Sequence, residues 1–185
     1  MNCYKHPRPA VTTDALVFGY NRRTDTLEIL LIKRKNPPFE GMFALPGGFV
    51  EMNETLEECA ARELAEETEL LGVPLIQMRA FSKVDRDPRG RTISVAFFGL
   101  IDSTTARVDG RDDAARAEWV RLLELPKLAF DHNEIVDYAV KFAFRNIRTE
   151  VDRYPDCDFS RFKDLIEFVG RKKLLEILGQ YGHFE

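Results

Sequence analysis

The chain contains 185 residues, the length of one domain with a small extension. Its net charge of −4, from 27 basic and 31 acidic residues, argues against a non-specific nucleic-acid binder, because such proteins carry a basic excess. The cysteines Cys3, Cys59 and Cys157 are far apart and odd in number, which favours free thiols in a reducing compartment over a disulfide framework.

The amino-terminal part predicts a hairpin, and we expect no signal peptide before it. Residues 1–7 lack the apolar run of a signal peptide, and no apolar run in the chain approaches the ~18 residues that span a bilayer. We therefore expect a cytoplasmic protein without a membrane partner. Residues 11–20 and 27–35 are rich in β-branched and aliphatic side chains, and the polar residues 21–25 between them predict a turn.

A loop and then the clearest helical pattern of the chain follow. Residues 36–41 and 46–48 are rich in Pro and Gly, which is typical of loops. Residues 55–71 predict a helix, and Thr55 with Glu58 three positions later matches a capping box. One arc of this helix has the spacing of a buried face: Ala60, Ala61, Leu64, Thr68 and Leu71.

The remainder of the chain changes from strands to helices. Further strands are predicted at residues 75–82, 92–101 and 118–122, with a polar turn at residues 85–90. Helices are predicted at residues 132–149, 160–169 and 171–179. We therefore expect a mixed α/β domain over residues 1–128 and a helical tail over residues 129–185.

Three glutamates of the first helix lie on one face. Glu63, Glu66 and Glu67 occupy positions i, i+3 and i+4, so their carboxylates project within an arc of about 100°. Like charges so placed repel, and a divalent cation relieves the repulsion, because Mg²⁺ prefers carboxylate oxygens. A merely solvated acidic face is the alternative. Before the helix, Gly47-Gly48 lets the backbone approach a ligand closely.

The spacing of these glycines and glutamates forms a longer motif. Gly48 is followed after five residues by Glu54, and after seven more by Arg-Glu-Leu-Ala-Glu-Glu at residues 62–67. The motif resembles the Nudix box, the signature of the Nudix hydrolases, which cleave nucleoside diphosphates linked to another moiety. The resemblance covers roughly residues 10–128. It implies a Nudix-type α/β/α sandwich with a mixed sheet, and water attack on a pyrophosphate with Mg²⁺ or Mn²⁺ as cofactor.

The resemblance also implies roles for single residues. The metal would be held by the carboxylates of Glu63, Glu66 and Glu67 and by the carbonyl of Gly47. One of these glutamates would activate the water. Arg62 and Glu54 would pair to orient the loop and the helix.

One box position departs from the family's pattern. Glu69 stands where the family usually has a glycine that ends the helix, a position at which glycine commonly adopts the left-handed conformation. Because Leu71 continues the buried arc, we expect the helix to run on to Leu71 and Gly72 to make the cap. The alternative is that Glu69 itself is left-handed.

Segments that flank the box resemble those of ADP-ribose pyrophosphatases. They are residues 35–41 and 43–48 and the turn at residues 86–91. The resemblance implies hydrolysis of ADP-ribose to AMP and ribose 5-phosphate. Basic side chains of the turn suit contact with phosphate or ribose oxygens, or they form a solvated hairpin tip: Lys83, Arg86, Arg89 and Arg91.

Other side chains have two interpretations each. Phe39 and Phe43 either stack on adenine or belong to the core. Asp112 and Asp113 are candidates for a further carboxylate of the substrate site, because Nudix hydrolases often supply one from a later loop. We expect His132 at the surface or in a helix cap rather than at a ligand.

The tail raises an alternative function. Residues 128–135 resemble the junction in Nudix-related transcriptional repressors of NAD metabolism, which sense ADP-ribose and bind DNA through a winged helix. Residues 160–179 would then be a helix-turn-helix remnant, with Arg171-Lys172-Lys173 facing phosphate. No strand pair for a wing is apparent, and every expected box ligand is present, whereas such repressors often have a degraded box. We therefore expect an enzyme without a nucleic-acid partner and, by family analogy, a homodimer.

Overall fold

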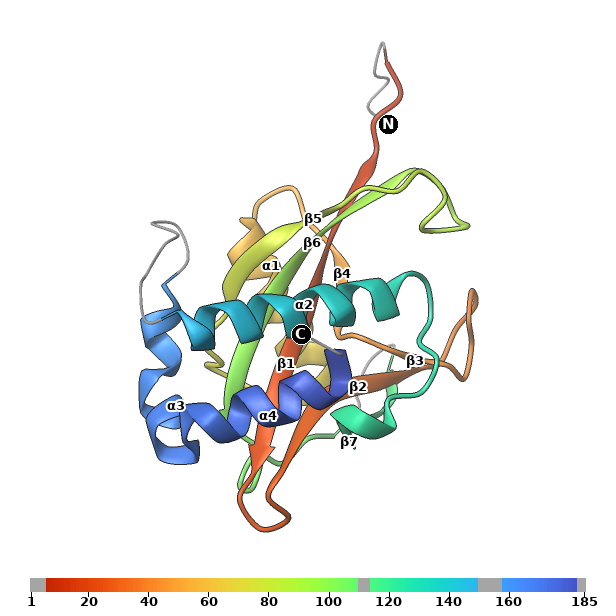
Figure 1. Cartoon of the computed structure of the whole chain (residues 1–185). Helices are drawn as coiled ribbons and strands as arrows, with labels where there is room; N and C mark the ends of the chain where they lie inside the picture. The colour runs from red at the N-terminus through yellow and green to blue at the C-terminus, as the bar shows by residue number, and fades with distance from the viewer. Residues whose placement is uncertain (1–5, 110–113, 150–157, 183–185) are drawn as a thin grey trace.

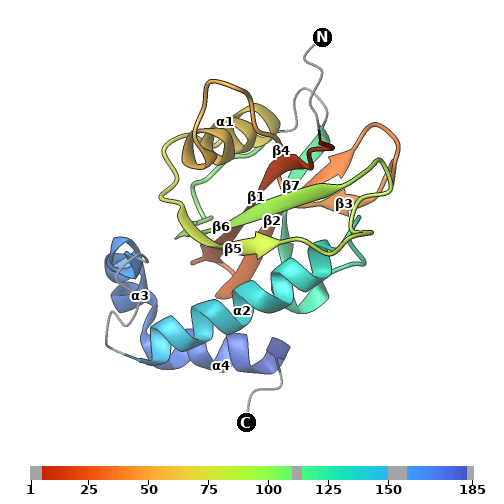
Figure 2. The same cartoon turned by 90° about the horizontal axis from the view of Figure 1, so that it is seen from above.

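The structure is a computed structural model that describes residues 6–109, 114–149 and 158–182. Its helices are α1 (Leu56–Thr68), α2 (His132–Arg148), α3 (Lys163–Val169) and α4 (Arg171–Gly182), with 3₁₀ turns at Leu122–Glu124 and Phe159–Phe162. A sheet lies between α1 on one face and α2 and α4 on the other (Figure 1, Figure 2). The predicted α/β class with a helical C-terminal segment is confirmed.

The sheet is mixed, as predicted. Its strands are β1 (Ala10–Asn21), β2 (Thr26–Arg34), β3 (Phe43–Ala44), β4 (Gly47–Phe49), β5 (Ile76–Phe81), β6 (Thr92–Asp102) and β7 (Ala114–Arg121). The order is β3-β2-β1-β6-β5, while β4 pairs with β1 and β7 with β2. β1 and β6 run parallel, and β1 and β2 form the expected antiparallel hairpin. β1 is almost continuously buried because helices cover both faces of the sheet.

An aromatic cluster joins the sheet to the C-terminal helices. The ring of Phe98 on β6 lies 5.7 Å from that of Phe18, 5.6 Å from those of Phe142 and Phe159, and 5.4 Å from that of Phe162. The core therefore continues across residue 128 into the C-terminal segment. The division into residues 1–128 and 129–185 stays a proposal from the character of the sequence. Within the described ranges, no helix combines the length and the apolar character that crossing a bilayer requires.

The first helix begins as predicted and ends earlier. Thr55 and Glu58 form the capping box, with reciprocal side-chain to backbone bonds of 3.2 and 2.8 Å. α1 stops at Thr68, and Glu69 adopts the left-handed conformation with φ 62°. The expectation that the helix runs on to Leu71 is wrong. The chain turns early because Leu70 packs beside Leu64, whereas Leu71 is 81% exposed.

Candidate active site

A cleft of about 590 Å³ lies where β1, β4, α1 and the start of α2 meet. All three box glutamates line it, together with Gly47, Arg62, Arg86 and Arg89. Four residues considered for substrate contact lie outside its lining: Phe39, Phe43, Lys83 and Arg91. Phe43 packs against the core, and Arg91 is exposed and donates to the carbonyls of Lys83 (3.4 Å) and Thr92 (3.2 Å). Asp112 and Asp113 lie outside the described residues.

Two glycines let β4 pass close to its neighbours. A Cβ atom at Gly47 would collide with the carbonyl of Thr13 on β1, and one at Gly48 would collide with the carboxyl group of Glu63. The Gly47 N–H donates to Oε2 of Glu67 at 2.8 Å. The β4 backbone is therefore joined directly to the acidic face of α1. The backbone carbonyl of Gly47 thereby lies near the glutamate carboxylates.

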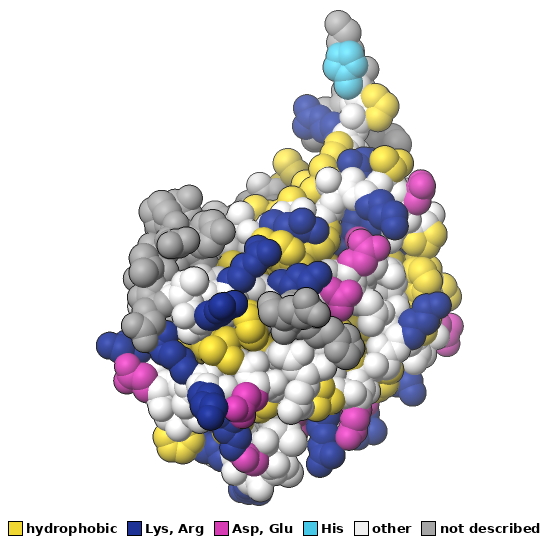
Figure 3. Space-filling view, viewed as in Figure 1, with side chains coloured by type: hydrophobic (Ala, Val, Ile, Leu, Met, Phe, Trp, Pro, Cys, Tyr) yellow, Lys and Arg dark blue, Asp and Glu magenta, His cyan; other side chains and the backbone are white. Residues whose placement is uncertain are grey.

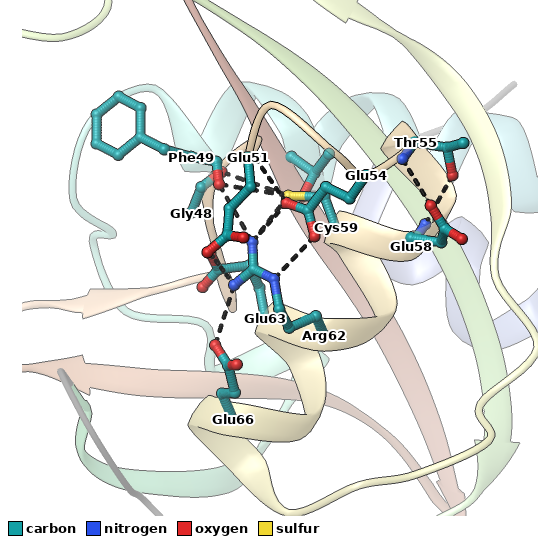
Figure 4. A network of polar contacts seen from close by, with 11 residues as sticks. Gly48, Phe49, Glu51, Glu54, Thr55, Glu58, Cys59, Arg62, Glu63 and Glu66 are labelled. Carbon is teal, nitrogen blue, oxygen red and sulfur yellow. Dashed lines mark hydrogen bonds and ion pairs between the residues drawn. The ribbon is translucent and has the colours of Figure 1, made fainter.

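Arg62 is the centre of the polar contacts on α1 (Figure 4). Its Nε and Nη2 donate to the two carboxylate oxygens of Glu54 at 2.9 and 2.6 Å, and Nη2 also donates to the carbonyl of Phe49 at 3.2 Å. Its Nη1 donates to Glu63 at 2.8 Å and to Glu66 at 3.0 Å. The hydrogen bonds from Arg62 and from the Glu51 backbone lower the pKa of Glu54 to about 2. We call Glu54, Arg62, Glu63, Glu66 and Glu67 the box wall; all of them except Glu54 line the cleft.

The box wall carries more negative charge than one arginine neutralises. Burial raises the pKa of Glu63, and the bond from Arg62 opposes that rise. Glu67 is buried and Glu66 is exposed. Among the described residues, no three acidic, histidine or cysteine side chains form a ready-made metal cage. The donors nevertheless fit Mg²⁺ or Mn²⁺, because such ions take one or two carboxylates and complete their shell with water and substrate phosphates.

A second charged cluster closes the inner end of the cleft. Arg86 is 7% exposed, and its guanidinium donates to both oxygens of Asp131 at 3.0 and 2.7 Å and to Asp14 at 3.4 Å. Ser94 donates to the same Asp14 oxygen at 2.5 Å. Arg86 is therefore no solvated hairpin tip, and its guanidinium is held by two carboxylates.

His132 completes this cluster. Its Nδ1 accepts the Leu45 N–H at 2.9 Å, and its Nε2 lies 3.5 Å from Asp14. Burial lowers the pKa of His132, so the neutral ring with its proton on Nε2 is favoured. The expectation of a surface or capping position is wrong. His132 is buried, because the first turn of α2 packs against the segment that contains Leu45. We call Asp14, Arg86, Asp131 and His132 the inner network.

Sequence reasoning did not find Asp14, Phe49 or Phe130 in the cleft lining, nor the contact of Asp131 with Arg86. One signal was present: Thr12-Thr13-Asp14 is a polar triplet inside an otherwise apolar strand, and all three side chains are buried. Phe39, a candidate either for stacking on adenine or for the core, is 37% exposed and packs edge-on against Phe130 at 4.8 Å.

Comparison with known proteins adds independent information. A family profile described as NUDIX domain matches residues 9–139. The ADP-ribose pyrophosphatase of Methanocaldococcus jannaschii is 48% identical over 136 residues, which are 73% of this chain and 75% of that protein. The ADPR responsive transcriptional repressor NtrR of Acinetobacter baylyi is 34% identical over 177 residues, which are 94% of this chain and 68% of that protein. The crystal structure of a MutT/nudix family protein from Enterococcus faecalis has a TM-score of 0.72 at 26% identity, covering 98% of this chain and 84% of that one.

Proposed function

Because the chain belongs to the NUDIX family and is a Nudix hydrolase, we propose that it cleaves the pyrophosphate of ADP-ribose to give AMP and ribose 5-phosphate. The observation that carries this proposal is the intact box wall, of which Glu63, Glu66 and Glu67 line one cleft beside Gly47. The 48% identity to an ADP-ribose pyrophosphatase supports the choice of substrate.

The proposal includes Mg²⁺ or Mn²⁺. Glu63, Glu66 and Glu67 would hold the ion with the carbonyl of Gly47, and the bound ion would supply positive charge to the diphosphate and acidify water. The Gly47 N–H fixes the Glu67 carboxylate, while Arg62 orients Glu63 and Glu66 and ties α1 to the loop through Glu54. One of the three glutamates would accept the proton of the attacking water.

The basic residues of the turn at 86–91 have different roles in this proposal. Arg89 lines the cleft and is placed to meet the substrate. The Arg86 guanidinium is committed to Asp131 and Asp14, so we assign it to holding the inner end of the cleft. Arg91 and Phe43 would reach substrate only after a rearrangement of their present contacts.

A substrate panel tests the proposal. The full chain is incubated with ADP-ribose, other sugar nucleotides and a dinucleotide, each with Mg²⁺, with Mn²⁺ and with excess chelator, and products are identified by chromatography. We expect AMP and ribose 5-phosphate from ADP-ribose in the presence of either metal only. Cleavage of another member of the panel, with ADP-ribose untouched, would contradict the choice of substrate.

An ADP-ribose-responsive regulator is the second candidate function, favoured by the similarity of 94% of the chain to NtrR. Against it, Lys173 pairs with Asp25 and Arg171 donates to the carbonyl of Ile147, so both contact the protein itself. On the face that α2 and α4 form, basic side chains gather over one end of α2 and acidic ones lie beside them, so the face is not uniformly basic (Figure 3). Salt-sensitive, nanomolar binding to a palindromic operator that ADP-ribose releases would establish the regulator instead.

The proposal also includes a homodimer in the cytoplasm. Family analogy supports the dimer, and cysteines without disulfide spacing support a reducing compartment. Light scattering coupled to size exclusion measures the mass directly, and a mass of one chain would exclude the dimer under those conditions.

A further inference from the structure

The outer rim of the cleft carries an exposed aromatic ring. Phe49 is 47% exposed although it follows directly after the box glycines and lines a cleft of charged side chains. Its backbone is fixed, because it pairs with Thr12 on β1 and its carbonyl accepts a hydrogen bond from Arg62. A large apolar side chain on such a fixed backbone presents a flat surface beside the proposed diphosphate site.

Arg89 lies against this ring and against a second one. Its Cζ atom is 5.2 Å from the ring centroid of Phe49 and 5.4 Å from that of Phe130. Phe130 is held in turn by Phe39 and by Arg34, whose Cζ lies 4.9 Å from its ring. Two aromatic rings from distant parts of the chain thus contact one planar cation at the mouth of the cleft.

The charge of Arg89 is already compensated. Asp87 is buried and accepts bonds from Nε (3.1 Å) and Nη2 (2.8 Å) of Arg89 and from its backbone N–H (2.9 Å). Although burial acts in the opposite direction, these bonds lower the pKa of Asp87. An arginine bound along one edge to a carboxylate has fewer donors left for phosphate, but its flat face still stacks on planar groups.

We propose that Phe49, Arg89 and Phe130 form the subsite for the planar base of the nucleotide, and that Arg89 acts there as a stacking surface rather than as a phosphate ligand. This inference rests on the proposed function, because the base is that of the nucleoside diphosphate substrate. Stacking on an aromatic side chain accounts for roughly 5- to 100-fold in affinity per base. Arg89 and Phe49 therefore determine selectivity for base-bearing ligands.

Equilibrium binding of two ligands to the full chain tests the assignment. AMP carries a base and a phosphate, whereas ribose 5-phosphate carries the phosphate alone, and calorimetry measures both with Mg²⁺ present. In F49L and R89M we expect AMP to bind about 5- to 100-fold more weakly and ribose 5-phosphate to bind within about threefold of wild type. F49W should restore AMP binding, because it keeps an aromatic face.

A matched control is available on α3. Phe168 is 60% exposed, and the Cζ atom of Arg22 lies 3.7 Å from its ring centroid. It therefore makes the same kind of arginine–aromatic contact as Phe49 and Arg89, but far from the box wall. F168L should leave both affinities unchanged. Thermal melts of each variant show that the fold is retained.

The outcomes separate this inference from the proposed function. If R89M weakens ribose 5-phosphate as much as AMP, Arg89 is a phosphate ligand and the assignment is wrong. Unchanged AMP affinity in F49L, or no AMP binding by the wild-type chain, would also overturn it. The chain could bind AMP in a manner that depends on Phe49 and yet not cleave ADP-ribose. That result would support the subsite and contradict the proposed function.

Discussion

The two charged walls of the cleft differ in how the chain builds them. The box wall comes from residues 54–67, so its members are near neighbours along one loop and one helix, and several of them contact solvent. The inner network joins β1, the turn before β6 and the start of α2, and its members are almost completely buried. Under the proposed function we infer a division of labour, in which the box wall would perform the chemistry and the inner network would hold the shape of the site.

The largest expected effect is on the box wall. E66Q and E67Q each remove a negative charge from the proposed metal site while keeping the shape of the side chain, so we expect kcat for ADP-ribose to fall by about 10²–10⁴-fold. Thermal stability should change little, since the glutamine oxygen of E67Q still accepts the Gly47 N–H. Steady-state kinetics at saturating Mg²⁺ measure the effect.

E57Q is the matched control, because Glu57 lies on the exposed face of the first turn of the same helix. Its kcat should equal that of the wild type. Wild-type turnover in both E66Q and E67Q would contradict the proposal that the box wall performs the chemistry.

The inner network should respond in stability rather than in chemistry. R86M leaves Asp14 and Asp131 buried without their cation, and breaking a buried pair in this way costs about 3–5 kcal/mol. Denaturant unfolding measures the change. R91M, an exposed position of the same turn, should cost less than about 0.5 kcal/mol. Equal effects of the two substitutions would show that the inner network contributes no more than a surface residue.

These two walls also show what the sequence can reveal. The box wall was predictable because its residues have a fixed local spacing, and the capping box that starts α1 was predictable for the same reason. The inner network was not, because Arg86 and Asp131 are 45 positions apart and meet only after the sheet and α2 have packed together. The end of α1 was mispredicted because Leu71 continues the helical arc of Leu64 and Thr68 in the sequence. In the folded chain Leu70 packs with Leu64 instead, and Leu71 is 81% exposed.

His132 gives the inner network a pH dependence of its own. Burial lowers its folded-state pKa below the ordinary 6.5, so the unfolded chain takes up the proton first and stability falls as the pH drops below 6.5. The slope from this group is at most about 1.4 kcal/mol per pH unit. H132Q keeps an acceptor for the Leu45 N–H but does not titrate, so its unfolding free energy should change less between about pH 5 and pH 7. Parallel curves for H132Q and wild type would assign the pH dependence to other groups.

The smallest expected effect concerns the end of α1, where the box wall meets the rest of the fold. Glu69 is left-handed at φ 62°, a conformation that glycine adopts without strain, so E69G should raise stability by about 0.5–1 kcal/mol and leave kcat unchanged. G72A should act in the opposite direction, because Gly72 also has a positive φ of 67°. Thermal melts decide the sign, and a lowered midpoint for E69G would show that Glu69 gains more from its contacts than it loses to strain.

Binding of Mn²⁺ tests the division between the walls most directly, because it needs neither substrate nor turnover. Electron paramagnetic resonance of free Mn²⁺ is followed while the wild type, E67Q and H132Q are titrated in turn. We expect wild type and H132Q to bind the ion with similar affinity and E67Q to bind it at least about tenfold more weakly. Undiminished binding by E67Q, or an equal loss in H132Q, would contradict the assignment of the metal to the box wall.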